Sequence, residues 1–393
     1  MHINFHMGRL LGGGIETTLL TYLNLFDRSL FEVSLTVGWR MDELDSFTKL
    51  LPKDIEIRYL VSNKSLSKYK IKKIMNSKLS LIDNLIENIL FVPIGRIIYI
   101  KKFKENLKHY DLILDFGLSL PKNCLCVNKP IIGFLHFDLE TYLSGKSRML
   151  SKLKNKFSNY SSIVVLNDKM LLDCRGTFSE VRYKFFKIYN LFDVDNIRAL
   201  SLEKLNNQMS NYIVTVCRLQ EDQKDVTTLI KAFNQARLKY CYSGKLVIVG
   251  DGGSRGELEK LTNDLNLNDH IVFMGSQQNP FKFMKHADAF VFSSKFEGFG
   301  NVIVEAMAVG VPIVATDCPV GPREILQDGD CGILVKVGDA EELARQINNV
   351  ITDTQLRQRL LSKSSLRVDD FAAVKNLTQL YKLINMSLAN DAK

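Results

Sequence analysis

The stretch AFVFSSKFEGFGNVIVE, residues 289–305, decides the fold of this chain. It opens with four apolar residues, 289–292, which have the length and composition of a buried strand. The glycine turn Glu297-Gly298-Phe299-Gly300 follows, and a helical pattern starts at Asn301. Gly310 ends that pattern, as glycine commonly does at helix C-termini. The sequence therefore predicts a strand, a glycine turn and a helix in succession.

The helix start predicted at Asn301 is suited to binding an anion. The first N–H groups of a helix have no partner within it, and the helix dipole is positive there, so a phosphate is a natural ligand. Two carboxylates, Glu297 and Glu305, frame the turn. Because carboxylates repel phosphate, we expect each to contact hydroxyl groups. A nucleotide sugar, with hydroxyl-rich groups on both sides of a diphosphate, fits this pattern; the alternative is that both glutamates are merely solvated.

The segment SSKFEGFGNVIVEAMAVGVPIVATDCPVGPREIL, residues 293–326, resembles the signature of the retaining glycosyltransferases of family 4, which share the GT-B fold. The resemblance implies that Glu297 contacts the donor sugar and that Glu305 holds the ribose hydroxyls. It also implies that the backbone of the glycine turn and helix start binds the diphosphate. Those residues are Gly298, Phe299, Gly300, Asn301 and Val302.

Other residues of the second half fit the same resemblance. Arg218 and Lys224 match a pair that grips the donor diphosphate in the family, and a planar guanidinium and a lysine point charge both suit phosphate oxygens. Asp225 stands where many relatives have glycine, which weakens the match at Lys224. The alternative is two solvated cations on a loop. Gly250, in the turn VGDGG, and Met274, at a strand end, are expected beside the nucleotide.

The first half contributes three candidates. Gly13 and Gly14 lie in a glycine loop before a helical run, and the resemblance implies that this loop faces the donor diphosphate. Glu16 is expected to be structural. His136 closes an apolar strand, at the edge where open α/β sheets place ligand-binding groups. We predict that His136 contacts the sugar, although a lone histidine is more often structural.

Strand–helix units repeat through both halves and predict an α/β fold with parallel sheets. The resemblance specifies GT-B: two Rossmann-like domains whose parallel sheets face across a cleft, with a C-terminal helix that crosses back to the N-terminal domain. We place an acceptor-binding domain at residues 1–192, with 371–393 packing back on it. A nucleotide-sugar-binding domain then occupies residues 193–370, and its first part, 193–208, reads as a polar connector.

The net charge of +9 indicates an anionic partner. We find no nucleic-acid-binding motif, so an acidic membrane surface or phosphorylated substrates are favoured. Residues 64–108 hold eleven lysines and arginines against three acids, with apolar residues at helical spacings. Such a segment suits an anionic membrane, at about 1 kcal/mol per lysine near the surface. The alternative is a core-packed helix with solvated lysines. The apolar run 89–100 is too short to span a bilayer.

No metal or cofactor is expected. The seven cysteines include no C-x-x-C pair and predict reduced, mostly buried thiols. Asp193-x-Asp195 is interpreted as a helix start, not a metal motif. In the mechanism implied by the resemblance, Arg218, Lys224 and the helix N-terminus stabilise the leaving diphosphate in place of a metal ion.

Together with these features, the resemblance implies a retaining, metal-independent glycosyltransferase. It would move a hexose or N-acetylhexosamine from a UDP-linked nucleotide sugar to a glycan or lipid-linked glycan in the synthesis of bacterial capsule or lipopolysaccharide. The expected location is cytoplasmic, peripheral on the inner face of the cell membrane. The alternatives are a GT-B nucleotide-sugar epimerase and a non-catalytic donor-binding subunit. A nicotinamide enzyme is disfavoured because the first half lacks the full glycine fingerprint.

Overall fold

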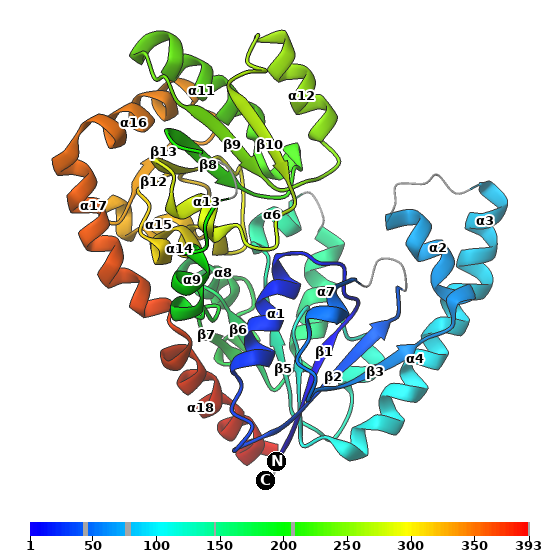
Figure 1. Cartoon of the computed structure of the whole chain (residues 1–393). Helices are drawn as coiled ribbons and strands as arrows, with labels where there is room; N and C mark the ends of the chain where they lie inside the picture. Colours follow the sequence, from blue (N-terminus) through cyan, green and yellow to red (C-terminus); the bar gives the residue numbers. More distant parts are fainter. Residues whose placement is uncertain (42–45, 75–79, 145–146, 206–208, 392–393) are drawn as a thin grey trace. The chain divides into compact units, whose positions relative to one another are not determined.

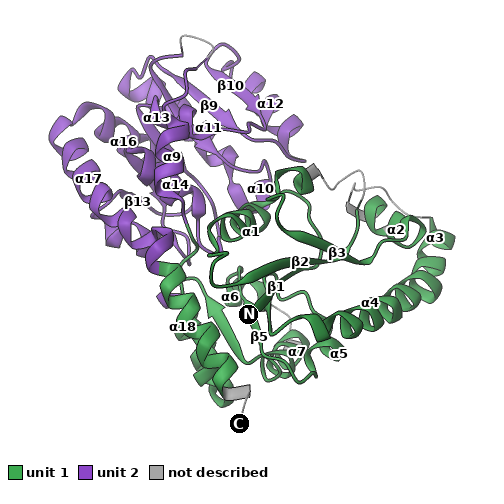
Figure 2. Ribbon diagram, turned by 60° about the horizontal axis from the view of Figure 1, so that its bottom comes forward, with its two compact units in different colours: residues 1–166, 170–191, 376–393 green, residues 167–169, 192–375 purple. Residues whose placement is uncertain are grey.

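The computed structural model describes residues 1–41, 46–74, 80–144, 147–205 and 209–391. The chain forms two compact units, which Figure 2 distinguishes by colour. Unit 1 comprises Met1–Leu166, Met170–Leu191 and Asn376–Lys393, and unit 2 comprises Asn167–Lys169 and Phe192–Lys375. The N-terminal part of the chain and its last helix thus belong to one unit.

Unit 1 is built on a seven-stranded sheet in the order β3-β2-β1-β4-β5-β6-β7, and every adjacent pair is parallel (Figure 1). The strands are β1 (His2–Met7), β2 (Glu32–Trp39), β3 (Glu56–Val61), β4 (Leu112–Asp115), β5 (Ile131–Phe134), β6 (Ser162–Val165) and β7 (Phe185–Lys187). Its α-helices are α1 (Gly14–Leu25), α2 (Lys64–Ile74), α3 (Leu81–Ile86), α4 (Val92–Asn106), α5 (Lys122–Leu125), α6 (Leu139–Leu143), α7 (Ser147–Phe157) and α8 (Asp168–Thr177). Residues 75–79 of the predicted basic segment lie outside the described residues.

Unit 2 has a six-stranded parallel sheet in the order β10-β9-β8-β11-β12-β13. The strands are β8 (Tyr212–Val216), β9 (Lys245–Val249), β10 (Ile271–Gly275), β11 (Ala289–Phe292), β12 (Ile313–Thr316) and β13 (Ile333–Val335). The helices are α9 (Val194–Ser201), α10 (Glu221–Lys224), α11 (Val226–Tyr240), α12 (Arg255–Asp264), α13 (Phe281–Lys285), α14 (Asn301–Val309), α15 (Pro322–Ile325), α16 (Ala340–Thr352) and α17 (Thr354–Arg367). Residues 206–208 of the predicted connector lie outside the described residues.

Both sheets follow one plan. The first three strands run outward to one side, and the chain then returns to pair the fourth strand with the first. The point where the strand order reverses lies between β1 and β4 in unit 1 and between β8 and β11 in unit 2. In open α/β sheets, ligands bind beyond the carboxyl ends of the strands at this point. Each unit therefore has one sheet edge at which a ligand is expected to bind.

The C-terminal helix α18 (Ala373–Asp391) runs from unit 2 into unit 1. The Tyr381 hydroxyl accepts a hydrogen bond from the Asp27 N–H at 2.9 Å, and its ring contacts Phe26 and Phe31. Ser387 Oγ lies 3.2 Å from Ser162 Oγ in the sheet. The predicted packing of a C-terminal helix on the N-terminal half is confirmed.

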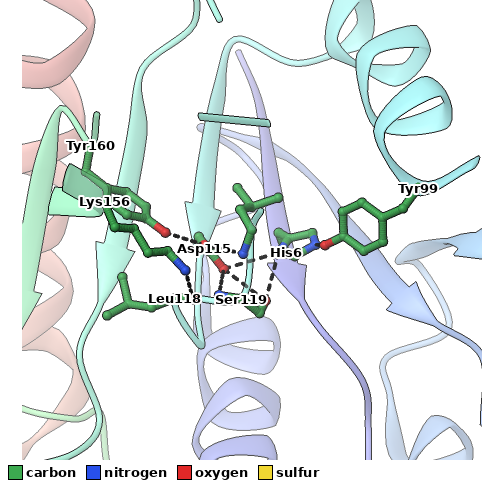
Figure 3. A network of polar contacts seen from close by, with 8 residues as sticks. His6, Tyr99, Asp115, Leu118, Ser119, Lys156 and Tyr160 are labelled. Atoms are coloured by element: carbon green, nitrogen blue, oxygen red, sulfur yellow. Dashed lines mark hydrogen bonds and ion pairs between the residues drawn. The ribbon is translucent and has the colours of Figure 1, made fainter. Parts of the chain in front are cut away.

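A closed polar network occupies the reversal point of unit 1 (Figure 3). Asp115, the last residue of β4, lies between His6 of β1, whose Nδ1 is 3.2 Å away, and the Tyr160 hydroxyl, which donates to it at 2.6 Å. Asp115 also accepts the N–H groups of Ser119 and Leu120. The side chains of His6 and Asp115 are fully buried. The network therefore ties the loop after β4 to the sheet.

Burial opposes ionisation of Asp115, but the hydrogen bond and attraction of His6, together with Lys156 and Tyr160, outweigh it and hold the pKa of Asp115 below its ordinary value. The network extends outward to α4, because the Tyr99 hydroxyl lies 2.7 Å from His6 Nε2. Lys156 of α7 donates to the Leu118 carbonyl. Because these donors and acceptors are satisfied within the protein, we assign the network a structural role.

Candidate functional site

The stretch from β11 to α14 folds as the sequence predicts. Gly300 adopts a left-handed conformation, with φ of 100°, immediately before α14 begins at Asn301. Gly310 ends the helix in the same region, at φ of 74°, and its N–H bonds to the carbonyls of Ala306 and Met307. L-residues other than glycine rarely adopt this region, so the two glycines set the limits of the helix. The N-terminus of α14 thus lies at the carboxyl edge of the sheet, directly after β11.

The glycine turn is held by a close backbone approach. Gly321, at φ of 100°, lies so near Phe299 that a Cβ atom there would fall 1.8 Å from the Phe299 carbonyl oxygen. Phe299 itself is buried, with its ring centroid 5.9 Å from that of Phe371. The carbonyl of Gly298 accepts a 3.4 Å bond from the Asn167 side chain. Gly321 therefore has a structural role, and the turn has a fixed shape.

Glu297 and Lys224 form an ion pair, although 72 residues separate them in the chain. The Lys224 ammonium donates to Glu297 Oε1, which also accepts from Ser294 Oγ at 2.8 Å. Gln223 Nε2 reaches the other carboxylate oxygen at 3.4 Å. The Lys224 side chain is 16% exposed and the Glu297 side chain is 10% exposed, so the pair is largely, but not completely, shielded from solvent. Two residues predicted for separate roles are thus joined at one edge, after β8 and after β11.

Asp225 explains why a glycine is not required after Lys224. Asp225 adopts the left-handed conformation, with φ of 49° and ψ of 45°, that the turn between α10 and α11 demands. Aspartate tolerates this region better than most residues. Its carboxylate accepts from Thr228 Oγ1 at 2.8 Å and lies 3.3 Å from Lys295 Nζ. The departure from the family pattern therefore preserves the backbone turn that positions Lys224.

Arg218, Gly250 and Met274 lie at or just after the ends of neighbouring strands, at the same edge of the unit 2 sheet. Arg218, after β8, is exposed. Gly250, after β9, has φ of 133°, and a Cβ atom there would lie 1.9 Å from the Cys217 carbonyl oxygen. Met274 lies in β10, where its carbonyl accepts from Gln277 Nε2 at 2.8 Å. Because Gly250 packs against the residue that precedes Arg218, the two loops are locked together.

Glu305 lies in the second turn of α14 and is partly buried, as is Val302 in the first turn. Among the described residues no hydrogen bond or ion pair reaches its carboxylate. Burial raises the pKa of Glu305 to about 7. A ligand that donates hydrogen bonds to this carboxylate stabilises its ionised form.

In unit 1, Gly13 and Gly14 form the start of α1. The Glu16 carboxylate accepts the N–H groups of Leu11 at 3.1 Å and Gly13 at 3.0 Å, which closes a capping arrangement. The expected structural role of Glu16 is confirmed. A Cβ atom added at Gly14 would meet nothing within 4 Å, so the loop is open beside it.

His136 follows β5, at the carboxyl edge of the unit 1 sheet. Its ring packs near the rings of Phe116 and Phe134, with centroids 4.9 and 6.2 Å away. Burial lowers the pKa of His136 to about 4, against the hydrogen bond to the Phe116 backbone, so the ring is neutral at physiological pH. Its Nε2 is buried and has no hydrogen-bond partner among the described residues. A neutral imidazole with one unused nitrogen is able to bind a hydroxyl group.

Sequence reasoning missed several residues that shape these sites. Ser294 and Gln223 hold the Glu297 carboxylate, and His6 and Asp115 form the network of unit 1. Only Ser294 carried a local signal, because it lies three residues before Glu297. Within the described ranges, no cluster of three or more metal-ligating side chains occurs. Four of the seven cysteines are buried and all are free, as predicted.

Residues 197–367, most of unit 2, match the family described as glycosyl transferases group 1. An uncharacterized glycosyltransferase of Methanocaldococcus jannaschii is 32% identical over 248 residues, which cover 58% of this chain and 59% of that protein. The N-acetylgalactosamine-N,N'-diacetylbacillosaminyl-diphospho-undecaprenol 4-alpha-N-acetylgalactosaminyltransferase of Campylobacter jejuni is 35% identical over 216 residues, which cover 55% of this chain and 58% of that enzyme. The matches thus span less than two thirds of either relative.

The similarity in three dimensions extends over nearly the whole chain. The crystal structure of Anabaena HepE in complex with UDP-glucose superposes with a TM-score of 0.76 and 22% identity, and covers 98% of this chain and 100% of that one. At this identity the comparison establishes the fold alone. The predicted GT-B fold, with two Rossmann-like domains built on parallel sheets, is confirmed.

Proposed function

We propose that this chain is a glycosyltransferase of the group 1 family and that its C-terminal unit binds the nucleotide-sugar donor. The observation that carries the proposal is the strand–turn–helix around Gly300. There a helix N-terminus, the pair Lys224–Glu297 and the partly buried Glu305 share one sheet edge. The family match over 197–367 covers all of these residues. We further propose that the donor is a UDP-linked hexose or N-acetylhexosamine.

The diphosphate lies at the N-terminus of α14, where the backbone of Gly298 to Val302 forms its cradle. Arg218, which is exposed, and Lys224 supply the positive charge. Without donor, Lys224 is neutralised by Glu297. When the diphosphate binds, the ammonium shares its charge with the phosphates, and Glu297 becomes available to the sugar hydroxyls. This exchange avoids leaving either side chain buried without a partner.

Glu305 binds the ribose hydroxyls. A ribose diol offers two donors, and these stabilise the ionised carboxylate, which burial alone disfavours. The nucleotide therefore lowers the pKa of Glu305 on binding. Gly250 and Met274, at the ends of β9 and β10, border the space for the base.

Transfer proceeds with retention of the anomeric configuration. As the bond from the anomeric carbon to the phosphate oxygen breaks, negative charge grows on the diphosphate. Arg218, Lys224 and the helix N-terminus stabilise that charge without a metal ion. The departing phosphate accepts the proton of the acceptor hydroxyl on the same face of the sugar, and Glu297 orients the sugar without attacking it.

The N-terminal unit contributes His136, Gly13 and Gly14. The free Nε2 of His136 accepts a hydrogen bond from a sugar hydroxyl, which the low pKa of its neutral ring permits. The open backbone at Gly14 leaves the start of α1 accessible to a phosphate group.

The acceptor is a hydroxyl of a glycan or lipid-linked glycan in bacterial surface polysaccharide synthesis. The name of the Campylobacter relative, which acts on a diphospho-undecaprenol glycan, supports this class of acceptor. No helix in the described ranges is long and apolar enough to cross a bilayer. We propose peripheral attachment at the inner face of the cell membrane, through the basic segment 64–108.

Two measurements test this function. Thermal shifts with UDP, GDP, ADP and their sugars should show the largest stabilisation with UDP compounds. Turnover with lipid-linked glycans should then yield an α-product from an α-linked donor, with chelator present. Donor consumption that releases UDP without an acceptor would point to an epimerase, and tight UDP binding without any turnover would point to a non-catalytic subunit.

The role of Glu297 has its own test. Glu297→Gln keeps the size of the side chain but weakens its hold on both Lys224 and the sugar. We expect kcat to fall by about 100-fold or more, in the range for loss of a group acting in the transition state. Turnover close to that of the unchanged protein, with unaltered donor affinity, would remove Glu297 from the mechanism.

A further inference from the structure

The helical segment 81–97 presents apolar side chains that are between 37% and 90% exposed. It runs through α3, a π-helical turn at Glu87–Phe91 and the first half of α4. No residue of α3 is buried; Leu81 is 90% exposed and Ile97 is 67% exposed. The exposed apolar residues on one side of this segment, which we call the apolar ridge, are Leu81, Ile82, Leu85, Ile86, Ile89, Leu90, Ile94 and Ile97. Contiguous apolar surface of this kind on a soluble domain usually marks an interaction site.

The opposite side of α4 is anchored in the domain. A Cβ atom at Gly95 would lie 2.3 Å from the Trp39 ring, so glycine allows the helix to sit directly on β2. Tyr99 bonds to His6 at 2.7 Å, and Phe103 is buried with its ring centroid 6.2 Å from that of His6. Figure 1 shows α4 alongside the edge strand β3, with α3 extending beyond it. The ridge is therefore the outer face of a fixed helix.

The helical geometry keeps the ridge on one side. Leu81, Leu85 and Ile89 follow one another at intervals of four residues, as do Ile82, Ile86 and Leu90. In an α-helix of about 3.6 residues per turn, such a repeat drifts around the axis. The wider turn at Glu87–Phe91 counteracts this drift.

Positive charge surrounds the ridge. Residues 64–108 hold eleven basic residues against three acidic ones, so this segment carries +8 of the net charge of +9. Exposed cations occur on α2 and α4: Lys64, Lys68, Arg96, Lys101 and Lys104. Lys101, Lys102 and Glu105 also line a pocket of about 380 Å³ between α2 and α4, whose walls include Leu66 and Ile98. The surface thus combines apolar side chains with a cationic border.

We propose that the apolar ridge enters the surface of an anionic lipid bilayer, with the helix 81–97 lying in the plane of the interface. The apolar side chains reach the boundary of the acyl chains, while the lysines of α2 and α4 contact lipid phosphates. The charge selects this occupant over a second copy of the chain, because a symmetric pair would place two cationic borders against each other.

The docking has a consequence for unit 1. The helix that carries the ridge is bonded through Tyr99 to His6, which belongs to β1 and to the network at the reversal point of the sheet. Attachment through the ridge therefore fixes the orientation of the carboxyl edge of this sheet relative to the lipid surface. This inference deepens the proposed peripheral attachment and names the surface responsible, but it does not depend on glycosyl transfer.

The test is flotation of the full chain with phosphatidylcholine vesicles that contain or lack phosphatidylglycerol. The double variant Leu85→Asp, Ile89→Asp places two charges on the ridge and should weaken binding to anionic vesicles at least about ten-fold. Leu238→Asp and Leu366→Asp, at exposed leucines of unit 2, are the matched controls and should bind as the unchanged protein does. Raised salt should weaken binding of the unchanged protein.

Thermal unfolding and UDP binding verify that the ridge variant is folded. Equal vesicle binding by the ridge variant and the unchanged protein would overturn the inference, as would failure of the unchanged protein to bind anionic vesicles. Self-association that the ridge variant abolishes, without vesicle binding, would reassign the ridge to a dimer interface. Absence of UDP binding with intact vesicle binding would count against the proposed function alone.

Discussion

The reversal points of the two sheets hold similar chemistry in different surroundings. In unit 1, His6 and Asp115 are completely buried, and hydroxyl and backbone donors from several elements close the network around them. In unit 2, Lys224 and Glu297 pair at the equivalent place but keep 16% and 10% of their side-chain surface exposed. Beside them lie the N-terminus of α14 and the exposed Arg218.

The difference in exposure indicates that the reversal point of unit 1 has a structural role, whereas that of unit 2 binds a ligand. A buried charged group whose hydrogen bonds are all made within the protein has no free donor or acceptor for a ligand. Removing one of its partners lowers the free energy of unfolding. A pair at a partly open edge can exchange partners. The comparison thus predicts that substitutions in the His6–Asp115 network act on stability and those at the Lys224–Glu297 pair act on donor binding.

The largest effect is expected at Asp115. Asp115→Ala leaves the Tyr160 hydroxyl and two backbone N–H groups without an acceptor, and should lower the free energy of unfolding by about 3–5 kcal/mol. Because the folded state lowers the pKa of Asp115, its contribution to the free energy of unfolding depends on pH. The contribution is present above the unfolded pKa, near 3.8, and is lost as pH falls toward the lower folded pKa. Urea denaturation across acidic pH measures both. Loss of transfer activity at unchanged stability would make Asp115 a site residue and break the comparison.

Lys224 should show the opposite behaviour. Lys224→Ala removes a cation from the proposed diphosphate site, and we expect transfer to fall by about 100- to 1,000-fold, with weaker UDP binding. The double variant Lys224→Met, Glu297→Gln controls for the glutamate that the single change leaves unpaired. Asp225→Gly is the matched neighbour: it keeps the left-handed turn and should alter UDP affinity less than two-fold, within about 0.4 kcal/mol. Normal UDP affinity in Lys224→Ala would refute the diphosphate contact, which titration calorimetry can measure.

A smaller effect is expected at Glu305, where substitution should raise stability but lower the affinity for UDP. Because its folded pKa is raised to about 7, Glu305 lowers stability as pH rises from about 4.5 through 7. Glu305→Gln should therefore stabilise the ligand-free chain at pH 8 by on the order of 1–3 kcal/mol while weakening UDP binding about ten-fold. Thermal unfolding with and without UDP reports both quantities. A variant that is no more stable at pH 8 and binds UDP normally would show that Glu305 is only a helix residue.

Much of the fold could be predicted from the sequence. Short apolar runs that each precede a helix identified the strands, and the glycines at 300 and 310 identified the limits of α14. The interpretation of Asp193 as a helix start is also confirmed, since its carboxylate accepts the Asn196 N–H at 3.1 Å. These features depend on neighbouring residues, which is why local patterns reveal them.

The features that escaped prediction depend on distant contacts. The helix α4 continues through Pro93 and Gly95 because proline is tolerated in a first turn and glycine packs on Trp39, which no local pattern reveals. His6 and Asp115 are separated by 109 positions, and each looks like an ordinary strand residue. The pairing of Lys224 with Glu297 likewise follows only from the order of strands β8 and β11 in the sheet.

The most direct test of the account is a crystal structure of the chain with UDP. We predict that the diphosphate lies against the backbone N–H groups at the start of α14, with Lys224 and Arg218 on its oxygens and Glu305 bonded to the ribose hydroxyls. A structure with UDP bound elsewhere, or with Glu305 turned away from the ribose, would contradict the central claim.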